Sequence, residues 1–228
     1  MIDLLNDISM WPKNMLRDFG RRAGRILAAL ELAPQIRGRS NFVYWIQALL
    51  WYFFDFIGGP ELVQFFLRAA TETRKLTFDE IERSEAVLGR GAVRFQDVRI
   101  ATGGVLTRFF GMNKNRAFAT WHTVNLPQSK FDDVSLLVHE LTHVLQYERI
   151  GSVYITEGLS VQRRHGRRAY SYGGSEGLRR SHAAGKKLRD YNREQQGQIA
   201  QDYTALVTKN QDTDAYRPFI DDLQKGLI

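Results

Sequence analysis

Two histidines and a glutamate in the run HELTH have the types and the spacing of a metal-dependent hydrolase. His139 and His143 are four residues apart, so one helical turn brings both imidazoles to the same side, where they can share one ion. Glu140 then lies near the open side of that ion. Zinc lowers the pKa of a bound water towards ~7, and a carboxylate takes its proton as the water attacks a carbonyl group. The motif therefore predicts a zinc-dependent hydrolase, most simply a peptidase, with Glu140 as the catalytic base.

A third zinc ligand must come from outside the HELTH run, because catalytic zinc usually takes three protein ligands and keeps one position for water. The chain has no cysteine, so the ligand is a His, Asp or Glu. A chain leaving the motif helix needs a turn and a second packed helix before a side chain points back. That requirement favours Glu194 over Glu157, which follows His143 closely. Glu157 stays open as an alternative, as do His165, His182 and an aspartate.

Further polar side chains are candidates to donate a hydrogen bond to the oxyanion of the transition state or to contact the substrate. Tyr170, Tyr172 and His165 lie in the basic stretch between the two presumed ligand helices, and His122 lies on the strand before the motif helix. A peptide could pair with the exposed edge of that strand near Trp121 and His122. Taken singly, each of these residues is more often a packing or surface residue.

The elements around the motif point to a small α+β domain. The motif helix has Asp132 or Asp133 as its N-cap and stops at Gly151. Segments rich in β-branched and aromatic residues predict three strands within residues 93–126, namely VRFQDVRI, GVLTRFF and RAFATWHTVNL. A later helix carries Glu194 in its first turn. We expect a zincin-like core in which a small, mostly antiparallel sheet packs on the motif helix and the third-ligand helix follows.

The N-terminal part of the chain predicts helices that are both apolar and basic. Residues 12–33 have the pattern of a basic amphipathic helix. Residues 42–57 are strongly apolar, but they fall short of the ~20 residues that cross a bilayer and contain Gln47 and Asp55. A buried core helix is the favoured interpretation, with an interfacial or re-entrant helix and a membrane span as alternatives. The interfacial alternative predicts contact of residues 12–70 with a membrane surface.

The formal net charge is +7, and most of the excess follows the motif helix. Residues 148–198 contain eleven Lys and Arg against five Asp and Glu. This run could hold an anionic partner near the metal, although a solvated basic face explains it equally well. We do not expect nucleic acid as the main partner. The N-terminus lacks the basic start and the apolar core of an export signal, which predicts cytoplasmic synthesis, with membrane association or export by an injection system as further fates.

Five segments between about residues 75 and 207 carry a family resemblance: LTFDEIERSEAVLG, VRI, the strand ending in NLP, LLVHELTHVLQYERIG and YNREQQGQIAQDY. They resemble small zincin-like domains encoded beside Rhs, VgrG-related and extracellular contractile injection genes, which are described as predicted metallopeptidases. The resemblance implies that Glu194 is the third ligand, as in gluzincin-like enzymes. Gly197 departs from the family pattern, in which we expect Ala, and a glycine inside a helix costs ~1 kcal/mol relative to Ala.

Three parts are predicted: an N-terminal helical region, residues 1–70, a zincin-like metallopeptidase domain, residues 71–210, and a C-terminal tail, residues 211–228. One Zn²⁺ is the expected cofactor. A peptide or protein is the expected substrate, and a component of a secretion machine is a further partner. Two other functions stay open: a catalytically inactive zinc-binding module that binds a membrane surface or nucleic acid, and a toxin or accessory domain delivered by an injection system.

Overall fold

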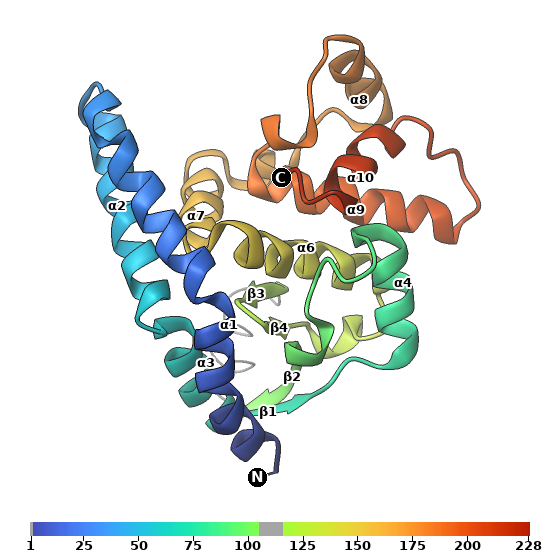
Figure 1. Ribbon diagram of the computed structural model, residues 1–228. Coiled ribbons are helices and arrows are strands. Elements are labelled where there is room, and N and C mark those ends of the chain that lie inside the picture. Colours follow the sequence, from blue (N-terminus) through green and yellow to red (C-terminus); the bar gives the residue numbers. More distant parts are fainter. Residues whose placement is uncertain (1, 105–115) are drawn as a thin grey trace.

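The structure is a computed structural model that describes residues 2–104 and 116–228 (Figure 1). Its helices are α1 (Ile2–Leu32), α2 (Arg39–Phe56), α3 (Gly59–Ala69), α4 (Phe78–Leu88), α6 (Val134–Ile150), α7 (Val153–His165), α8 (Gly174–Ala183), α9 (Arg193–Thr208) and α10 (Arg217–Gln224). Its strands are β1 (Thr71–Arg74), β2 (Arg99–Gly104), β3 (Phe118–Thr120) and β4 (Thr123–Asn125). The chain is therefore an α+β protein with N-terminal helices, as the sequence predicts.

The four strands form one sheet in the order β1-β2-β4-β3. Strand β2 pairs antiparallel with β1 and parallel with β4, and β4 pairs antiparallel with β3. The sheet is thus mixed, whereas three strands in a mostly antiparallel sheet were expected. Strand β1 escapes prediction because its sequence, TETR, has no apolar alternation. The predicted strand GVLTRFF begins at Gly104, the last residue of β2, and its other residues lie outside the part of the chain that the structure describes.

The segment RAFATWHTVNL, predicted as one strand, contains the tight hairpin of β3 and β4. The chain turns at Trp121, whose φ of 52° is a left-handed conformation that bulky residues rarely adopt. The backbone nitrogen of Trp121 donates to the hydroxyl of Tyr154 at 3.0 Å, and its indole Nε1 donates to Ser152 Oγ at 2.7 Å. Contacts with the α7 region therefore stabilise this turn, and no Gly or Asn marks it in the sequence.

Helix α6 occupies the centre of the molecule, between the sheet and α9 (Figure 1). Asp133 caps its first turn by accepting a hydrogen bond from the backbone nitrogen of Leu136 at 3.1 Å. Gly151 ends it with a φ of 84°, which favours glycine. Its apolar side chains in the main hydrophobic core are Leu137, Val138, Leu141, Val144 and Leu145. Because α6 is covered on both sides, the residues of its HELTH run are held rigidly.

Helices α1 and α2 form an antiparallel hairpin beside α6 and α7, and α3 continues from α2 after a bend of 69° (Figure 1). No single described helix is long and apolar enough to cross a membrane, whereas the bent pair α2 and α3 meets those criteria when its two helices are taken together. Only Ala48 and Asp55 of α2 are buried. The interpretation of residues 42–57 as a buried core helix is therefore wrong, because most of the helix lies on the surface.

Polar contacts fasten this hairpin to the corner between α6 and α7. Arg21 and Arg25 donate to backbone carbonyl groups in the last turn of α6, at 3.1 to 3.2 Å, where the negative end of the helix dipole favours cations. The buried carboxylate of Asp55 accepts hydrogen bonds from the backbone nitrogen of Ser152, at 2.9 Å, and from its hydroxyl. Burial raises the pKa of Asp55, although Ser152 and Arg25 oppose the shift. The N-terminal helices are thus part of the frame that surrounds the HELTH helix.

Candidate metal centre

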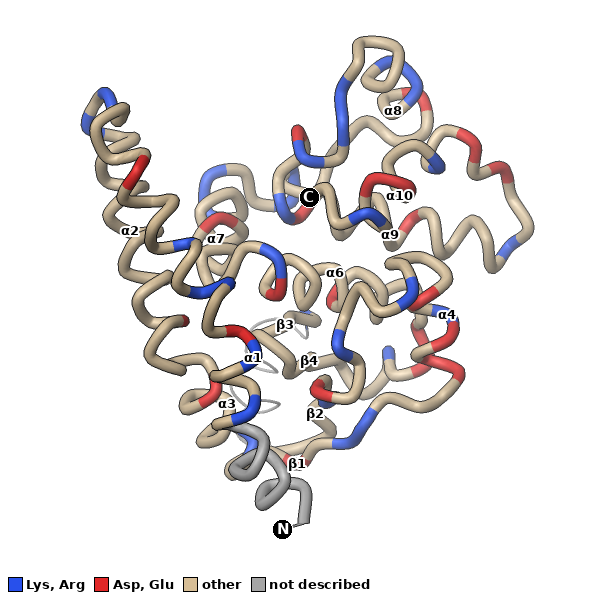
Figure 2. The backbone as a smooth tube through the Cα atoms, in the orientation of Figure 1, with Lys and Arg blue, Asp and Glu red and all other residues tan. Residues whose placement is uncertain are grey.

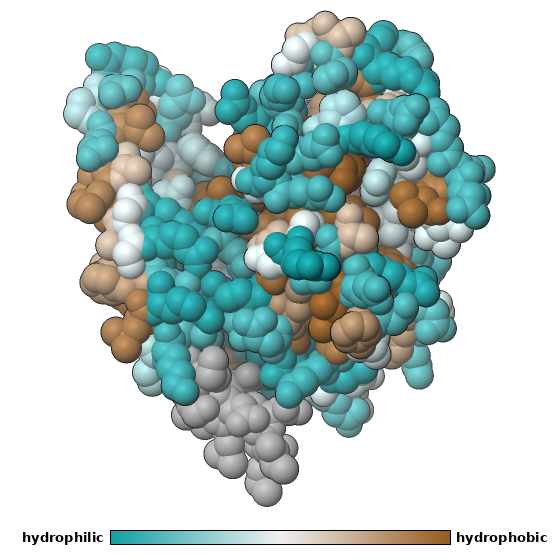
Figure 3. All heavy atoms as spheres, turned by 45° about the vertical axis from the view of Figure 1, so that its right-hand side comes forward, coloured by the Kyte–Doolittle hydropathy of each residue, from teal (hydrophilic) through white to brown (hydrophobic). Residues whose placement is uncertain are grey.

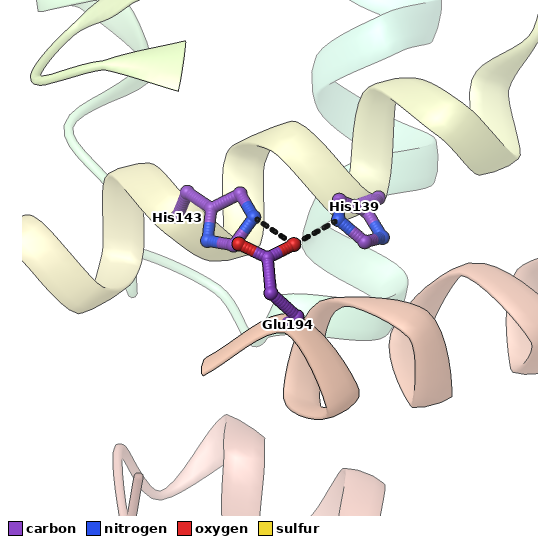
Figure 4. Close-up of side chains that lie close together, drawn as sticks. All are labelled: His139, His143 and Glu194. Carbon is purple, nitrogen blue, oxygen red and sulfur yellow. Dashed lines mark ion pairs between the residues drawn. The ribbon is translucent and has the colours of Figure 1, made fainter. Parts of the chain in front are cut away.

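The side chains of His139, His143 and Glu194 meet at one point between α6 and α9 (Figure 4). Glu194 Oε2 lies 3.8 Å from His139 Nε2 and 3.7 Å from His143 Nε2. All three residues are buried, and their candidate ligand atoms lie within 4.8 Å of one another. Tetrahedral zinc with bonds of ~2.1 Å separates its ligand atoms by roughly 3.4 Å. The spacing and the donor set, two imidazoles and a carboxylate, both fit a zinc ion.

Local structure explains why Glu194 points at α6. Asn192 caps α9 and forms a reciprocal capping box with Gln195, which fixes the first turn that carries Glu194. Gln146 of α6 then joins the two helices, because its Nε2 donates to the carbonyl oxygen of Arg193 at 3.0 Å and to Gln196 Oε1 at 2.9 Å. The third candidate ligand is therefore set by the packing of α9 on α6.

Gln146 also orients one of the histidines. Its Oε1 lies 2.8 Å from His143 Nδ1, so that Nδ1 donates to it and Nε2 faces Glu194. Ligating histidines commonly donate their second ring nitrogen in this way, which fixes the tautomer and the ring plane. For His139, the second ring nitrogen has no hydrogen-bond partner among the described residues.

The site concentrates opposite charges in a buried place. Burial lowers the pKa of His143, but Glu194 and Glu140 outweigh it and raise that pKa to about 9. Burial raises the pKa of Glu194, but the two histidines outweigh it and hold that pKa well below its usual value. The ionised carboxylate of Glu194 thus favours a positive charge on the histidines. A bound metal ion would supply that positive charge in place of the proton on His143.

Glu140 lies on α6 beside the three candidate ligands, and all four residues line one pocket, which is described below. It is 3% exposed, and its Oε2 has no hydrogen-bond partner in the part of the chain that the structure describes. Burial raises the pKa of Glu140, although the neighbouring histidines oppose the shift. Burying a carboxylate oxygen without a hydrogen-bond partner costs free energy, so packing alone does not explain this side chain. The same free oxygen is chemically able to take up and release a proton.

The other candidate ligands lie elsewhere. Glu157 of α7 accepts a hydrogen bond from the Tyr44 hydroxyl at 2.5 Å and pairs with Arg193 Nε at 2.6 Å, so both of its oxygens are engaged. His165 and His182 are exposed at the ends of α7 and α8. The structure therefore brings Glu194 to the two motif histidines, whereas Glu157, His165 and His182 do not reach them.

A pocket of about 350 Å³ opens beside the candidate ligands. Its lining is mainly apolar and comes from β3 and the residues just before it, from α6 and from α7. Tyr170, in the short helix Gly166–Tyr170, also lines it, with its ring centroid 6.0 Å from that of His139. Burial and the neighbouring Glu194 raise the pKa of Tyr170, so its hydroxyl stays protonated and can donate a hydrogen bond.

Two other predicted contact residues face away from this pocket. The Tyr172 hydroxyl donates to Asp202 and lies 3.0 Å from the Tyr216 hydroxyl. His122 is buried with its Nε2 2.7 Å from Glu148 Oε1. The idea that a peptide pairs with the strand at Trp121 and His122 is wrong in its placement, because both residues are buried at the hairpin turn and β4 lies between β2 and β3. Strand β3 is the edge strand on this side of the sheet.

Three site residues have no counterpart in the sequence prediction. Tyr154 of α7 stacks on His143 with ring centroids 6.4 Å apart, and its hydroxyl donates to the carbonyl oxygen of Ala119 in β3 at 3.1 Å. A Cβ at Gly158 would lie 3.0 Å from Glu194 Oε1, so this glycine leaves room for the carboxylate. Gln146, described above, lies three residues after His143, and that spacing is the only sequence signal among the three.

Gly197 of α9 lies directly against the ring of His139, where a Cβ would meet ring atoms at 3.0 to 3.1 Å. We expect Gly197→Ala to lower zinc affinity about tenfold, because the methyl group displaces a ligand, although Ala improves the helix by ~1 kcal/mol. Competition with a chromophoric chelator measures the affinity. Gly24→Ala in α1 is the matched control, since a Cβ there meets nothing within 4 Å. Unchanged zinc affinity in Gly197→Ala would remove the steric explanation for this glycine.

Residues 79–151 match the family model described as "eCIS core domain". The match covers 73 of the 228 residues and includes the HELTH run, whereas Glu194 lies beyond it. It supports an association of this chain with extracellular contractile injection systems. No curated protein and no solved structure matches the chain.

Proposed function

We propose that this chain is a zinc-dependent peptidase. The observation that carries the proposal is the meeting of His139, His143 and Glu194 within 4.8 Å, with Glu140 beside them in one pocket. Each component has a separate chemical use, and a packing role alone does not explain three buried ionisable groups around one point. When bound, zinc lowers the pKa of a coordinated water and polarises the scissile carbonyl group.

Glu140 is the proton carrier in this proposal. Its free Oε2 accepts a proton from the attacking water, and its raised pKa lets it hold that proton until the leaving amine takes it. The Tyr170 hydroxyl, which accepts a hydrogen bond from Gln162 Nε2 at 3.0 Å, is placed to donate a hydrogen bond to the developing oxyanion.

The substrate in this proposal is an extended peptide that pairs with β3. This strand is one of the two edges of the described sheet, and together with the two residues before it borders the pocket over residues 116–120. An extended peptide can add to such an edge through backbone hydrogen bonds, while its side chains enter alternate pockets. The apolar pocket wall, which includes Ile155 and Leu159, favours an apolar side chain next to the cleaved bond.

We further propose that the peptidase acts as a component or a cargo of a contractile injection system. The match of residues 79–151 to the family model described as "eCIS core domain" supports this setting. The matched residues include the helix that carries Glu140. The match does not reach α9, so it supports the setting and leaves the chemistry to be tested.

Metal analysis combined with peptide cleavage tests the proposed function. We expect about one zinc per purified chain and cleavage of members of a peptide library, which 1,10-phenanthroline abolishes and added zinc restores. His143→Ala is expected to lose both zinc and cleavage. His182→Ala, a change of an exposed histidine on α8, is the control and is expected to keep both. A chain that takes up no zinc from zinc-containing buffer would overturn the proposal, as would cleavage that persists in His143→Ala.

A further inference from the structure

Helix α2 carries an apolar stripe on the side that faces away from the rest of the protein. The stripe consists of Val43, Ile46, Leu50 and Phe53, together with Ile57 directly after the end of the helix, and the exposed fractions of the five lie between 37% and 65%. The spacing of three and four residues places all five on one helix face. The two buried residues of this helix, Ala48 and Asp55, lie on the opposite face. The stripe therefore has no partner within the described chain.

Apolar side chains of the neighbouring helices extend this surface. On α1, Leu16, Phe19, Leu27 and Leu30 are 48% to 78% exposed, and Phe19 touches Phe56 of α2, with ring centroids 5.3 Å apart. On α3, Leu62 is 43% exposed and Phe66 is 63% exposed. Apolar surface is visible along the hairpin at the left of Figure 3. We call this surface, from the α2 stripe and the exposed apolar residues of α1 and α3, the hairpin face.

The charges near the tip of the hairpin are mainly positive, with Glu31 of α1 as an exposed acidic residue among them. No charged residue occurs from Ser40 to Phe54 of α2, and Arg37 and Arg39 lie at the tip of the hairpin without a salt bridge among the described residues. Beside α2, the exposed end of α7 and the helix after it contain four arginines, and no acidic residue occurs between Glu157 and Glu176. These are Arg163, Arg164, Arg167 and Arg168. Figure 2 shows both basic groups towards the same end of the molecule.

We propose that the hairpin face binds the surface of an anionic lipid bilayer, with α2 lying in the interface and the basic groups at the headgroups. An apolar helix face bordered by arginines is what such a surface takes up, through buried apolar area and attraction to anionic lipids.

A second copy of the chain fits this surface less well than lipid does. Helices that pair in water usually flank their apolar seam with charged side chains, which choose the partner and the register. Helix α2 has no charged side chain on either flank of its stripe, because Ser40 to Phe54 is uncharged. Together with α3, as a pair bent by 69°, it also meets the length and hydropathy criteria for a membrane span. The hairpin face therefore has the composition of a lipid-binding surface.

Binding at this surface also sets the orientation of the candidate metal site. The hairpin is fixed to the α6 and α7 corner by Asp55 and Ser152, and Tyr44 of α2 contacts Glu157 of α7. Helix α7 in turn lines the pocket. The protein on a bilayer would thus present its pocket at a constant angle to the lipid surface, whether or not the site proves to be catalytic.

Vesicle flotation of the full chain tests the proposal. We expect the chain to float with vesicles that contain phosphatidylglycerol and to bind pure phosphatidylcholine vesicles at least about tenfold more weakly. Leu50→Ser combined with Phe53→Ser is expected to reduce binding to the anionic vesicles at least about tenfold, since both side chains leave water on binding. Arg37→Gln combined with Arg39→Gln is expected to weaken binding to the anionic vesicles and to reduce its salt dependence.

Matched controls separate this surface from general stickiness. Phe78→Ser combined with Val207→Ser changes side chains that are 82% and 49% exposed but lie on α4 and α9, and we expect full binding. Lys209→Gln combined with Lys225→Gln controls for the loss of two positive charges. Circular dichroism checks that each variant is folded. The proposal fails if the native chain does not float, if the α2 variant floats as well as the native chain, or if the α2 variant only converts a dimer into a monomer in sedimentation velocity.

Discussion

Glu140→Gln is expected to keep its zinc and to lose peptide hydrolysis by roughly 10²- to 10⁴-fold in kcat, the usual contribution of a general base. The substitution keeps the shape of the side chain and removes only its ability to take up a proton. Glu140 is not among the three residues whose ligand atoms converge, so the metal content should not change. Zinc analysis and peptide cleavage on the same protein sample give both quantities.

The stability of this variant distinguishes a catalytic carboxylate from a structural one. Oε2 of Glu140 has no hydrogen-bond partner among the described residues and burial raises its pKa, so a neutral amide should fold at least as stably. Glu148 on the same helix is the contrasting case. It pairs with His122 and Arg94, and these contacts hold its pKa below the usual value despite burial. Glu148→Gln should therefore lower the melting temperature and leave the metal content unchanged. Full peptidase activity in Glu140→Gln would exclude Glu140 as the general base.

The features that the sequence predicts correctly are those that a few neighbouring residues determine. Helix α6 follows from an N-cap at Asp133, a glycine stop at Gly151 and an apolar run between them. The convergence of His139 and His143 follows from the helical period alone, since four residues make about one turn. Likewise, the capping box at Asn192 and Gln195 is visible as a local pattern.

Features that depend on distant contacts are not predictable in this way. The hairpin of β3 and β4 turns at Trp121, a residue that local rules place within a strand, because Tyr154 and Ser152 bind its nitrogen atoms from another part of the chain. The position of Glu194 near the histidines depends on the hydrogen bonds from Gln146 to α9. The distance along the chain from His143 makes Glu194 a better candidate than Glu157, but it does not place the Glu194 side chain. Such long-range contacts have no counterpart in local sequence patterns.

The apolar character of α2 shows a different limit. Hydropathy reports how apolar a segment is, but a core helix and a lipid-facing helix have the same composition. Only the structure shows that Val43, Ile46 and Leu50 point away from the protein while Ala48 is buried. Gly197 is similar, because a glycine that appears only as a weak point in a helix is explained once the ring of His139 is found against it.

The largest effect on metal binding is expected from Glu194→Ala, because it removes one of three candidate ligands. Changes in groups that only support a ligand already cost 10- to 100-fold in affinity, so we expect a loss of more than about 100-fold. Glu157→Ala removes the other proposed ligand. Both oxygens of Glu157 are bound by Tyr44 and Arg193, so its loss should loosen the contact between α2 and α7 and leave zinc affinity within about threefold of the native value.

Chelator competition on both variants, with circular dichroism as the check on folding, decides between the two carboxylates. Glu194→Gln is a useful third variant, because it keeps the volume beside Gly158 and the neutral amide is a weaker zinc ligand than the carboxylate. The three affinities should then rank the native chain with Glu157→Ala first, Glu194→Gln next and Glu194→Ala last. The reverse order, with Glu157→Ala the weakest binder, would mean that α7 rearranges on metal binding to supply the ligand, and that the convergence of Glu194 with the histidines is an ion pair of the metal-free protein.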